Sequence, residues 1–530
     1  MSTFPRSEFH LTQNWIVRKP TAAGEAGLVT SQVREAAEIG SAILEAGGDA
    51  VDAAVATGFA LAALEPWNSG LGGIGHMVIW RAREGRAEWI DFGPVSPSSL
   101  DPAAFPLSGG AGSDLFAWPA VVGDRNVHGA LSVAVPGQVA GLGLAHERFG
   151  RLPWNDVLRP AIAIARAGLP VDWYTTLRVA LFARELARYD DTATVWLPGG
   201  LPPVPAADAG ANRLVLGRLA ETLARLAEAG AADLYRGDVA RELVRDVRRA
   251  GGVLSPEDLK RYRARHGPPR AFRYGDAILH LPGRLTAAPT LATALGGFAA
   301  RARERDAPGP ATYLAYADAL STAYAERFEN IGDIGDARHP ACTTHLNVVD
   351  RQGNMVALTQ TLLSVFGSKL VSPSTGILLN NGIMWFDPRP ERANSLAPAK
   401  RPLTNMCPVV ATREDRGWLA IGGSGGRKIL PAVAQILSFL TDYRMNLEAA
   451  FHQPRIDASG EPEVSVDPRL PDAVFEAVAG RMAARRVELV VLPTNYACPC
   501  AILVDGATGL RTGISDVMSP WSGAVSERPR

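Results

Sequence analysis

The sequence predicts a protein that mixes α-helices with β-strands, and three local patterns lead to this prediction. Residues 34–46 carry apolar positions at helical spacing, and Gly47-Gly48 follow where a helix C-terminus favours glycine. Residues 50–64 are apolar on nearly every side, which is typical of a helix buried between two layers. Strand-like runs occupy residues 76–80 and 344–350. Together these patterns indicate an α/β or α+β fold.

Further elements are predicted along the chain. A short strand-like entry at residues 27–29 precedes the first helix. Residues 213–249 are expected to be rich in helix, because leucines recur at helical spacing among charged residues, at positions 216, 219, 223 and 226. Ser255 has the features of a helix N-cap, with a proline in the first turn and an acid three residues after the cap. A later helix is expected at residues 431–441.

The composition excludes some classes of partner. The 530 residues include 54 basic and 54 acidic side chains, so the net charge gives no electrostatic footprint for nucleic acid or an anionic membrane. The apolar stretches are too short and too rich in alanine to span a bilayer. Because the first ten residues lack the basic start and apolar run of a secretory signal, we expect a cytoplasmic protein. Small neutral or zwitterionic substrates remain open.

Two motifs resemble cofactor sites but have simpler structural interpretations. Gly70-Leu71-Gly72-Gly73-Ile74-Gly75 matches the dinucleotide fingerprint in form. That fingerprint must follow a strand and open a helix, whereas this run follows a helix and precedes a strand, so tight backbone packing or a loop bordering a functional site is expected. Cys498-Pro499-Cys500 has no accompanying histidine or second cysteine pair. With only two further cysteines, at 342 and 407, we expect buried thiols and no disulfide framework.

A β-hairpin is predicted in the middle of the chain. Residues 344–350 and 355–362 flank Arg351-Gln352-Gly353, where glycine stands at the loop position that requires a left-handed conformation. This register places Thr343 opposite Thr361, within side-chain reach. Taken alone, Thr361 would be an ordinary strand-forming residue.

Thr343-Thr344-His345 opens the first strand of this hairpin. A threonine hydroxyl is a poor nucleophile near neutral pH, but an α-amine freed by a cut just before it can serve as its base. Thr343 would then supply both the nucleophile and the base. The motif therefore indicates a second N-terminus hidden inside the chain.

Three further motifs follow in order: Leu378-Leu379-Asn380-Asn381, Lys400-Arg401-Pro402-Leu403 and Gly422-Gly423-Ser424-Gly425-Gly426. With the threonine motif they resemble the γ-glutamyltranspeptidase family in order and spacing. The resemblance implies an N-terminal-nucleophile hydrolase with an α+β fold, a four-layer α-β-β-α sandwich. It implies a precursor that cuts itself between Cys342 and Thr343, giving a large chain of residues 1–342 and a small chain of residues 343–530 in one intertwined unit. No metal or organic cofactor is required.

The resemblance also assigns roles to single residues. It implies that Thr343 attacks the amide carbonyl, that Thr361 orients it, and that the backbone amides of Gly425 and Gly426 form the oxyanion hole. The glycine run precedes a helix-like segment, and a helix start supplies such amides with little reorganisation. Thr404-Asn405 stand where the family has a substrate-binding serine pair. His345 is expected to pack or to make a structural hydrogen bond, since it is a base only if it reaches the nucleophile.

The usual substrate clamp of the family is largely missing. No arginine occurs near residues 93–99, Leu363 replaces an asparagine, and Gly382 and Trp385 replace polar and acidic ligands. Arg401 and Lys428 are either replacement charges or structural residues.

Three functions follow as alternatives. The family activity would be hydrolysis or transfer of γ-glutamyl compounds such as glutathione, with water or an amine as acceptor. The second is an amidase or acylase for another small acyl amide, such as an oxamate-like amide or a β-lactam side chain. The third, of another class, is a binding protein that keeps the fold without turnover.

Overall fold

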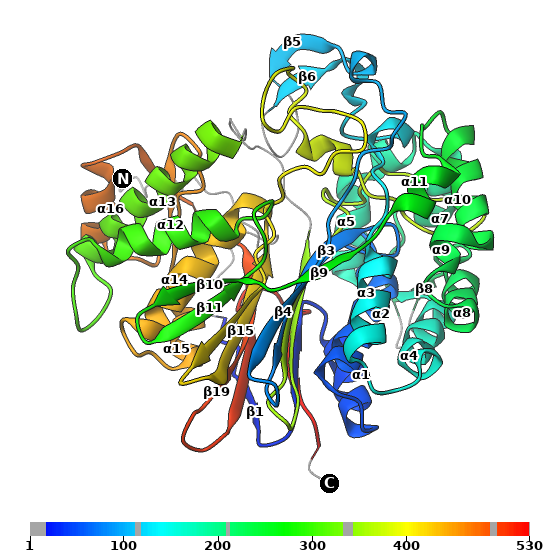
Figure 1. Cartoon of the computed structure of the whole chain (residues 1–530). Coiled ribbons are helices and arrows are strands. Elements are labelled where there is room, and N and C mark those ends of the chain that lie inside the picture. Colours follow the sequence, from blue (N-terminus) through cyan, green and yellow to red (C-terminus); the bar gives the residue numbers. More distant parts are fainter. Residues whose placement is uncertain (1–16, 112–117, 208–211, 332–342, 488–495, 529–530) are drawn as a thin grey trace.

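Two β-sheets stacked face to face form the centre of the molecule, and helices cover both outer faces (Figure 1). The computed structural model describes residues 17–111, 118–207, 212–331, 343–487 and 496–528 of the 530. This arrangement confirms the four-layer α-β-β-α sandwich expected for an α+β protein.

The first sheet, here sheet I, has seven antiparallel strands among the described residues. In spatial order they are β21 (Gly523–Ser526), β2 (Leu28–Ser31), β12 (Thr344–Val349), β13 (Met355–Thr361), β3 (Ile74–Arg81), β4 (Arg86–Phe92) and β9 (Arg265–Gly267). The predicted hairpin is present as β12 and β13, and Gly353 in its loop has φ +83°. The strand that begins after Thr343 is therefore central in the sheet.

In the part of the chain that the structure describes, the second sheet, sheet II, also has seven antiparallel strands. In spatial order they are β1 (Ala22–Gly24), β20 (Arg511–Ser515), β19 (Cys498–Val504), β15 (Arg416–Ser424), β14 (Val409–Arg413), β11 (Ala277–Leu281) and β10 (Arg270–Tyr274). Both sheets combine strands from before and after Thr343. Segments 17–331 and 343–528 are therefore intertwined, although the predicted cut itself stays a prediction.

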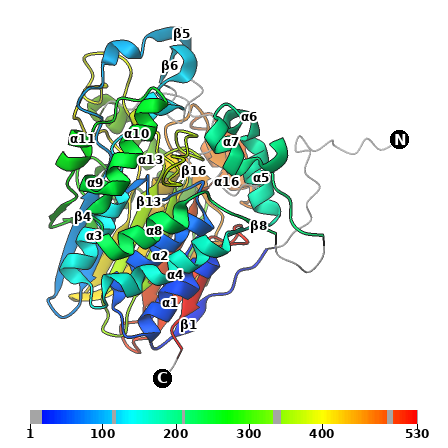
Figure 2. The same ribbon diagram turned by 90° about the vertical axis from the view of Figure 1, so that its right-hand side faces the viewer.

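Sheet I is covered by a thick layer of helices, which lie across its outer face (Figure 2). They are α1 (Arg34–Glu45), α2 (Ala50–Leu64), α3 (Gln138–Phe149), α4 (Trp154–Ala167), α5 (Trp173–Leu181), α6 (Ala183–Leu186), α7 (Asp190–Trp196), α8 (Leu219–Ala229), α9 (Asp233–Arg236), α10 (Asp238–Arg249) and α11 (Pro256–Arg261). Every residue of α2 is buried, as its apolar sequence predicts. Ser255 caps α11 through a reciprocal capping box with Asp258, which confirms the predicted helix start.

Helices of the second outer layer pack on sheet II. They are α12 (Ala288–Ala299), α13 (Pro310–Ile331), α14 (Ile429–Thr441) and α15 (Leu447–His452), with α16 (Asp472–Ala479) against α13. Short strands lie outside the main sheets: β5 (Leu107–Ala111), β6 (Pro119–Val121), β7 (Leu169–Pro170), β8 (Arg213–Leu214), β16 (Ile456–Asp457), β17 (Val464–Val466) and β18 (Ala484–Arg486). The predicted helix at residues 431–441 is the main part of α14.

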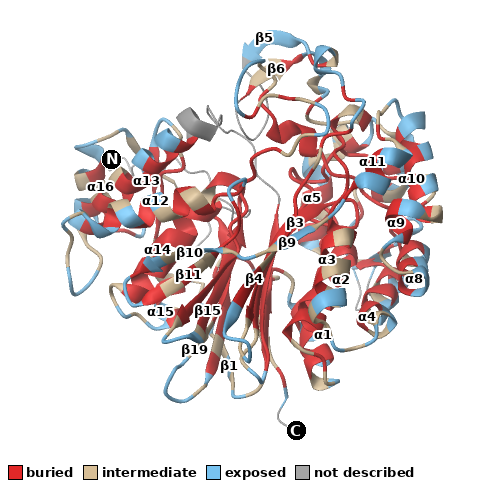
Figure 3. Ribbon diagram, in the orientation of Figure 1, coloured by how far each residue is buried: buried red, intermediate tan, exposed pale blue. Residues whose placement is uncertain are grey.

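Burial follows these layers (Figure 3). One apolar core lies between the α2 layer and sheet I, and another lies between sheet II and α14. A smaller core between the sheets includes Trp80, Met355 and Ile502. The glycine run that ends in Gly75 leads into strand β3 and not into a helix, as predicted, and a Cβ on Gly72 would lie 2.3 Å from the Leu378 carbonyl oxygen. These glycines therefore serve close backbone packing.

Candidate active site

Thr343 stands directly before β12, at the end of the central hairpin. Thr344 pairs with Gln360 across the two strands, so the next position places Thr343 beside Thr361, as the predicted register requires. Both threonines are almost completely buried, with exposed fractions of 5% and 1%. Cys342, the other residue of the predicted cleavage site, lies outside the described residues.

Thr361 is held by the turn that follows β13. Its Oγ1 accepts a hydrogen bond from the backbone N–H of Leu363 at 2.8 Å, and a hydroxyl that accepts one bond can still donate its own hydrogen. Leu363 has φ +86°, a left-handed conformation that costs a non-glycine residue on the order of 1–2 kcal/mol. The fold maintains this strained turn directly beside the threonine predicted to orient the nucleophile.

His345 is locked into a structural role. Its Nδ1 lies 2.8 Å from Thr359 Oγ1 and its Nε2 lies 3.0 Å from Asn347 Oδ1. Burial lowers the pKa of the imidazole to about 4, so the ring is neutral near pH 7. Since both ring nitrogens are engaged by neighbours, the geometry favours the packing role over that of a base.

The predicted oxyanion hole lies in a strand-turn-helix connection. β15 ends at Ser424, a short 3₁₀ turn (Gly426–Lys428) follows, and α14 begins at Ile429. Gly425 and Gly426 have φ +129° and +61°, and a Cβ on Gly425 would lie 2.9 Å from the Ala497 Cα. Only glycine fits such a backbone. The turn places backbone amides at the start of a helix, where they can stabilise a developing oxyanion.

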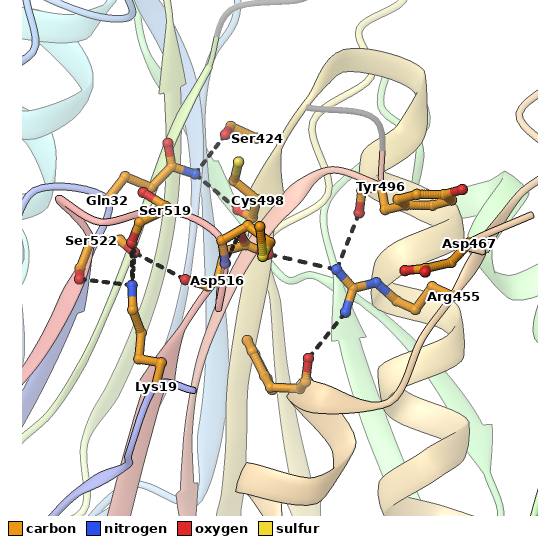
Figure 4. Close-up of polar contacts among 12 residues, drawn as sticks. Lys19, Gln32, Ser424, Arg455, Asp467, Tyr496, Cys498, Asp516, Ser519 and Ser522 are labelled. Carbon is orange, nitrogen blue, oxygen red and sulfur yellow. Dashed lines mark hydrogen bonds and ion pairs between the residues drawn. The ribbon is translucent and has the colours of Figure 1, made fainter. Parts of the chain in front are cut away.

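A buried glutamine fixes this turn relative to sheet I. Gln32, which follows β2, donates its Nε2 hydrogens to Ser424 Oγ at 2.6 Å and to the Cys498 carbonyl oxygen at 2.9 Å (Figure 4). The side chain therefore connects the ends of β2, β15 and β19. The sequence reasoning missed Gln32, because no local pattern marks a single glutamine after a strand.

Thr404 and Asn405 are held in place by an arginine of α13. Arg327 Nη2 donates to Asn405 Oδ1 at 2.8 Å and to the Thr404 carbonyl oxygen at 3.0 Å. The Thr404 hydroxyl donates to the Leu285 carbonyl oxygen at 3.1 Å and lies 3.4 Å from His76 Nε2. Arg327 was missed as well; the available signal was an arginine on the buried side of a helix rich in alanine and tyrosine.

The two candidate replacement charges are paired with carboxylates. Arg401 Nη1 lies 3.3 Å from Asp91 Oδ1 and donates to the Gly93 carbonyl oxygen at 3.0 Å. Lys428 Nζ lies 3.7 Å from Asp457 Oδ2. Both cations therefore have structural partners, which favours the structural interpretation of each.

Apolar side chains occupy the place of the expected clamp. Leu363 and Trp385 belong to one buried cluster, whose other members are Ile74, Trp118, Met384 and Met406. Gly382 leaves no room for a polar side chain, since a Cβ there would lie 2.7 Å from the Ala134 Cβ. The wall next to Thr361 is thus apolar and closely packed.

The paired asparagines act as scaffolding. Asn380 Nδ2 donates to the carbonyl oxygens of Gly72 and Ala134, at 2.7 and 3.0 Å, and its Oδ1 accepts from the N–H groups of Ala134 and Gly382. Asn381 bonds Ser364 through both ends of its amide. Their hydrogen bonds hold the loop after Thr361 in place.

A cavity of about 130 Å³ opens beside Thr343 on the side of the α2 layer. Its wall includes polar side chains that are themselves buried: Gln32, Glu65, Asn68, Tyr174, Arg178 and Ser424. Sequence reasoning assigned no role to Glu65 or Arg178. Long-range packing brings Glu65 to the cavity from the end of α2 and Arg178 from α5.

Within the described ranges, no group of three or more histidine, cysteine, aspartate or glutamate side chains is arranged to hold a metal ion. Cys407, Cys498 and Cys500 are buried thiols, as predicted, and burial raises the pKa of Cys407 and Cys500 to about 12. Among the described helices, none has the length and apolar character needed to cross a bilayer.

Comparisons with known proteins agree with this geometry. The family model described as Gamma-glutamyltranspeptidase matches residues 36–341 and 335–520. The chain is 33% identical over 503 residues to the Acylase ACY 1 proenzyme of Pseudomonas sp. (strain SE83), covering 87% of this chain and 88% of the acylase. It is 29% identical over 480 residues to the Glutathione hydrolase proenzyme of Escherichia coli (strain K12), covering 81% and 80% of the two chains.

A solved structure shares the whole fold. The cephalosporin acylase from Bacillus halodurans superposes with a TM-score of 0.82 over 100% of both chains, at 23% sequence identity. The four layers and their connections are therefore common to both molecules.

Proposed function

Because this chain belongs to the gamma-glutamyltranspeptidase family of self-processing hydrolases, we propose that it is an acylase that cleaves amides whose acyl group is not γ-glutamyl. The reaction would proceed through an acyl-enzyme on Thr343, which a cut before this residue exposes.

The observation that carries the proposal is the apolar wall beside Thr361. A γ-glutamyl head is zwitterionic, and each charge-assisted hydrogen bond that holds such a group contributes roughly 1.5–3 kcal/mol. Leu363 has no hydrogen-bonding side-chain atom, Trp385 offers only one neutral N–H donor, and the Arg401 and Lys428 charges are already paired. Loss of two charge-assisted bonds corresponds to roughly 3–6 kcal/mol, or a factor of about 10² to 10⁴ in kcat/KM.

In the proposed mechanism, Thr343 Oγ attacks the amide carbonyl while the Thr343 α-amine accepts the hydroxyl proton. The Gly425 and Gly426 amides stabilise the tetrahedral oxyanion, and Thr361 orients the attacking hydroxyl. The α-ammonium then gives its proton to the leaving amine. Water or an acceptor amine attacks the resulting ester and restores the free threonine.

Glutathione hydrolysis is the second candidate. The buried polar pair Thr404-Asn405 favours it, because the pair keeps hydrogen-bonding groups where the family has serines. This candidate requires a γ-glutamyl clamp built from other residues.

Substrate profiling separates the two. Purified, processed enzyme is assayed for release of p-nitroaniline from γ-glutamyl-p-nitroanilide and from p-nitroanilides of small neutral and apolar acids. We expect kcat/KM for the best apolar acyl group to exceed that for γ-glutamyl by about 100-fold or more, from the bond energies above. Preference for γ-glutamyl would reject the acylase and support the glutathione hydrolase. Leu363→Asn is the informative variant, since it returns the amide side chain to the wall.

A further inference from the structure

The cavity beside Thr343 contains a buried carboxyl group that the mechanism above does not use. Glu65 is the first residue after α2 and has an exposed fraction of 4%. Its Oε1 accepts a hydrogen bond from Asn68 Nδ2 at 2.6 Å. Among the residues that the structure describes, no partner makes a hydrogen bond of standard geometry with its Oε2, which is buried. Such an oxygen is costly to bury, so its position calls for a function.

The carboxyl group is coupled to the start of β12. Burial is the larger influence on the Glu65 carboxyl and raises its pKa to about 7. The Thr344 hydroxyl is near enough to act in the opposite direction and lower this pKa. Thr343, the adjacent residue, lines the same cavity as Glu65. Several polar side chains line the cavity, and it is large enough for several water molecules at roughly 30 Å³ each.

Self-cleavage poses a chemical problem that turnover of an external substrate does not. Before the cut, the Thr343 nitrogen is part of a peptide bond and cannot accept a proton. His345 does not fill this gap, because both its ring nitrogens are engaged by Thr359 and Asn347. The uncut chain therefore needs another proton acceptor near Thr343.

We propose that Glu65 is the proton acceptor for self-cleavage of the uncut chain, acting on the Thr343 hydroxyl through water held in the cavity. The inference rests on the proposed function, in which the cut exposes Thr343. Glu65 therefore holds the proton during processing, and the Thr343 α-amine takes over as the base once the chain is cut.

The steps balance without any added reagent except water. The Thr343 Oγ bonds to the preceding carbonyl carbon, and its proton passes through water to the Glu65 carboxylate. The C–N bond before Thr343 then breaks, and the proton moves from Glu65 to the new α-amine. A second water attacks the ester, the bond between the carbonyl carbon and Oγ breaks, and the water's proton returns to Thr343 through Glu65.

Other titratable groups around the cavity do not replace Glu65. Arg178 of α5 is a permanent cation that favours the Glu65 carboxylate and donates to the Tyr174 hydroxyl. Burial raises the pKa values of Tyr174 and of the Cys498 thiol, so both stay protonated at neutral pH. Asp172 accepts from Trp521 Nε1 at 2.6 Å and from the first turn of α5.

The test follows cleavage of newly made full-length chain by pulse-labelled cell-free translation and electrophoresis between pH 5.5 and 8.5. In the wild type, the cleavage rate should rise as Glu65 ionises, near pH 7. Glu65→Gln should cut at least 10-fold more slowly and lose this pH dependence. Glu65→Asp should recover part of the rate and all of its pH dependence. Once cut, Glu65→Gln should release amine from substrate at a rate per cleaved molecule within about twofold of wild type.

Glu35→Gln is the matched control, since Glu35 is an exposed glutamate at the rim of the same cavity and should leave cleavage unchanged. The inference is overturned if Glu65→Gln keeps the wild-type rate and pH profile. It is also overturned if cleavage, turnover and thermal stability fall together and Glu65→Asp restores none of them, because that pattern indicates a structural role. Failure of the proposed function would look different, with the wild-type chain itself remaining uncut before Thr343.

Discussion

Replacing Thr361 by valine should separate the orientation of the nucleophile from the integrity of the fold. Thr361 has an exposed fraction of 1%, and valine matches its shape while removing Oγ1. The Leu363 N–H, which bonds this oxygen at 2.8 Å, then loses its acceptor. An unpaired buried N–H costs about 1–3 kcal/mol, so the free energy of unfolding should fall by about that amount.

Activity should fall further than stability explains. If the Thr361 hydroxyl orients Thr343, its hydrogen bond strengthens as charge develops on Oγ. Loss of a bond to a charged group, about 1.5–3 kcal/mol, should lower kcat roughly 10- to 150-fold. The assay combines urea denaturation with amine release per processed molecule, measured at a temperature where the variant is fully folded. Thr361→Ser keeps the oxygen and is the matched control.

The result that refutes this reasoning is a Thr361→Val enzyme that is destabilised as expected but retains wild-type kcat. Thr361 would then serve only the turn at Leu363, and its assigned role in orienting the nucleophile would be wrong.

Three further predictions concern other parts of the site. Gly425→Ala should reduce amine release about 100-fold or more, because its Cβ would lie 2.9 Å from the Ala497 Cα and disturb the oxyanion turn. Gly267→Ala is the control and should have no effect, because a Cβ there would lie in open space. Equal activity of the two variants would contradict the role of the turn. Thr343→Ala should abolish both cutting and turnover, with Thr343→Ser keeping some of each; either activity surviving in the alanine variant would exclude Thr343 as nucleophile. Burial lowers the folded-state pKa of His345 and His76 to about 4, against about 6.5 when unfolded, so their contribution to stability is present above pH 6.5 and is lost as the pH falls toward 4. In thermal melts from pH 7 to 4, the melting temperature should therefore fall more steeply for wild type than for His345→Gln. Equal falls in the two proteins would contradict the lowered pKa of buried His345.

The sequence predicts those parts of the site that depend on local rules. Side-chain alternation and a glycine in the loop fix the β12–β13 register, so the pairing of Thr343 with Thr361 follows from neighbouring residues alone. The Gly425-Gly426 turn is predictable for a similar reason, since a strand, a glycine run and a helix follow one another directly.

The remaining features depend on contacts between distant segments. Arg327 reaches Thr404 and Asn405 across 77 and 78 positions, and Gln32 reaches Ser424 across 392. Glu65 approaches Thr344 only because α2 packs on sheet I. No periodicity or spacing in the sequence predicts contacts between such distant residues. The paired asparagines show the opposite case: their motif is easily recognised in the sequence, but only the structure shows that its hydrogen bonds hold a loop in place.

Intact-mass spectrometry of the enzyme during turnover tests the central claim most directly. Processed protein is mixed with equal concentrations of a γ-glutamyl amide and an apolar acyl amide, quenched in acid within the first turnovers, and its fragments are weighed and mapped. We predict a small chain that begins at Thr343 and carries the apolar acyl group on that residue, with little γ-glutamyl adduct. An uncut chain, an adduct on another residue, or a predominant γ-glutamyl adduct on Thr343 would contradict the account.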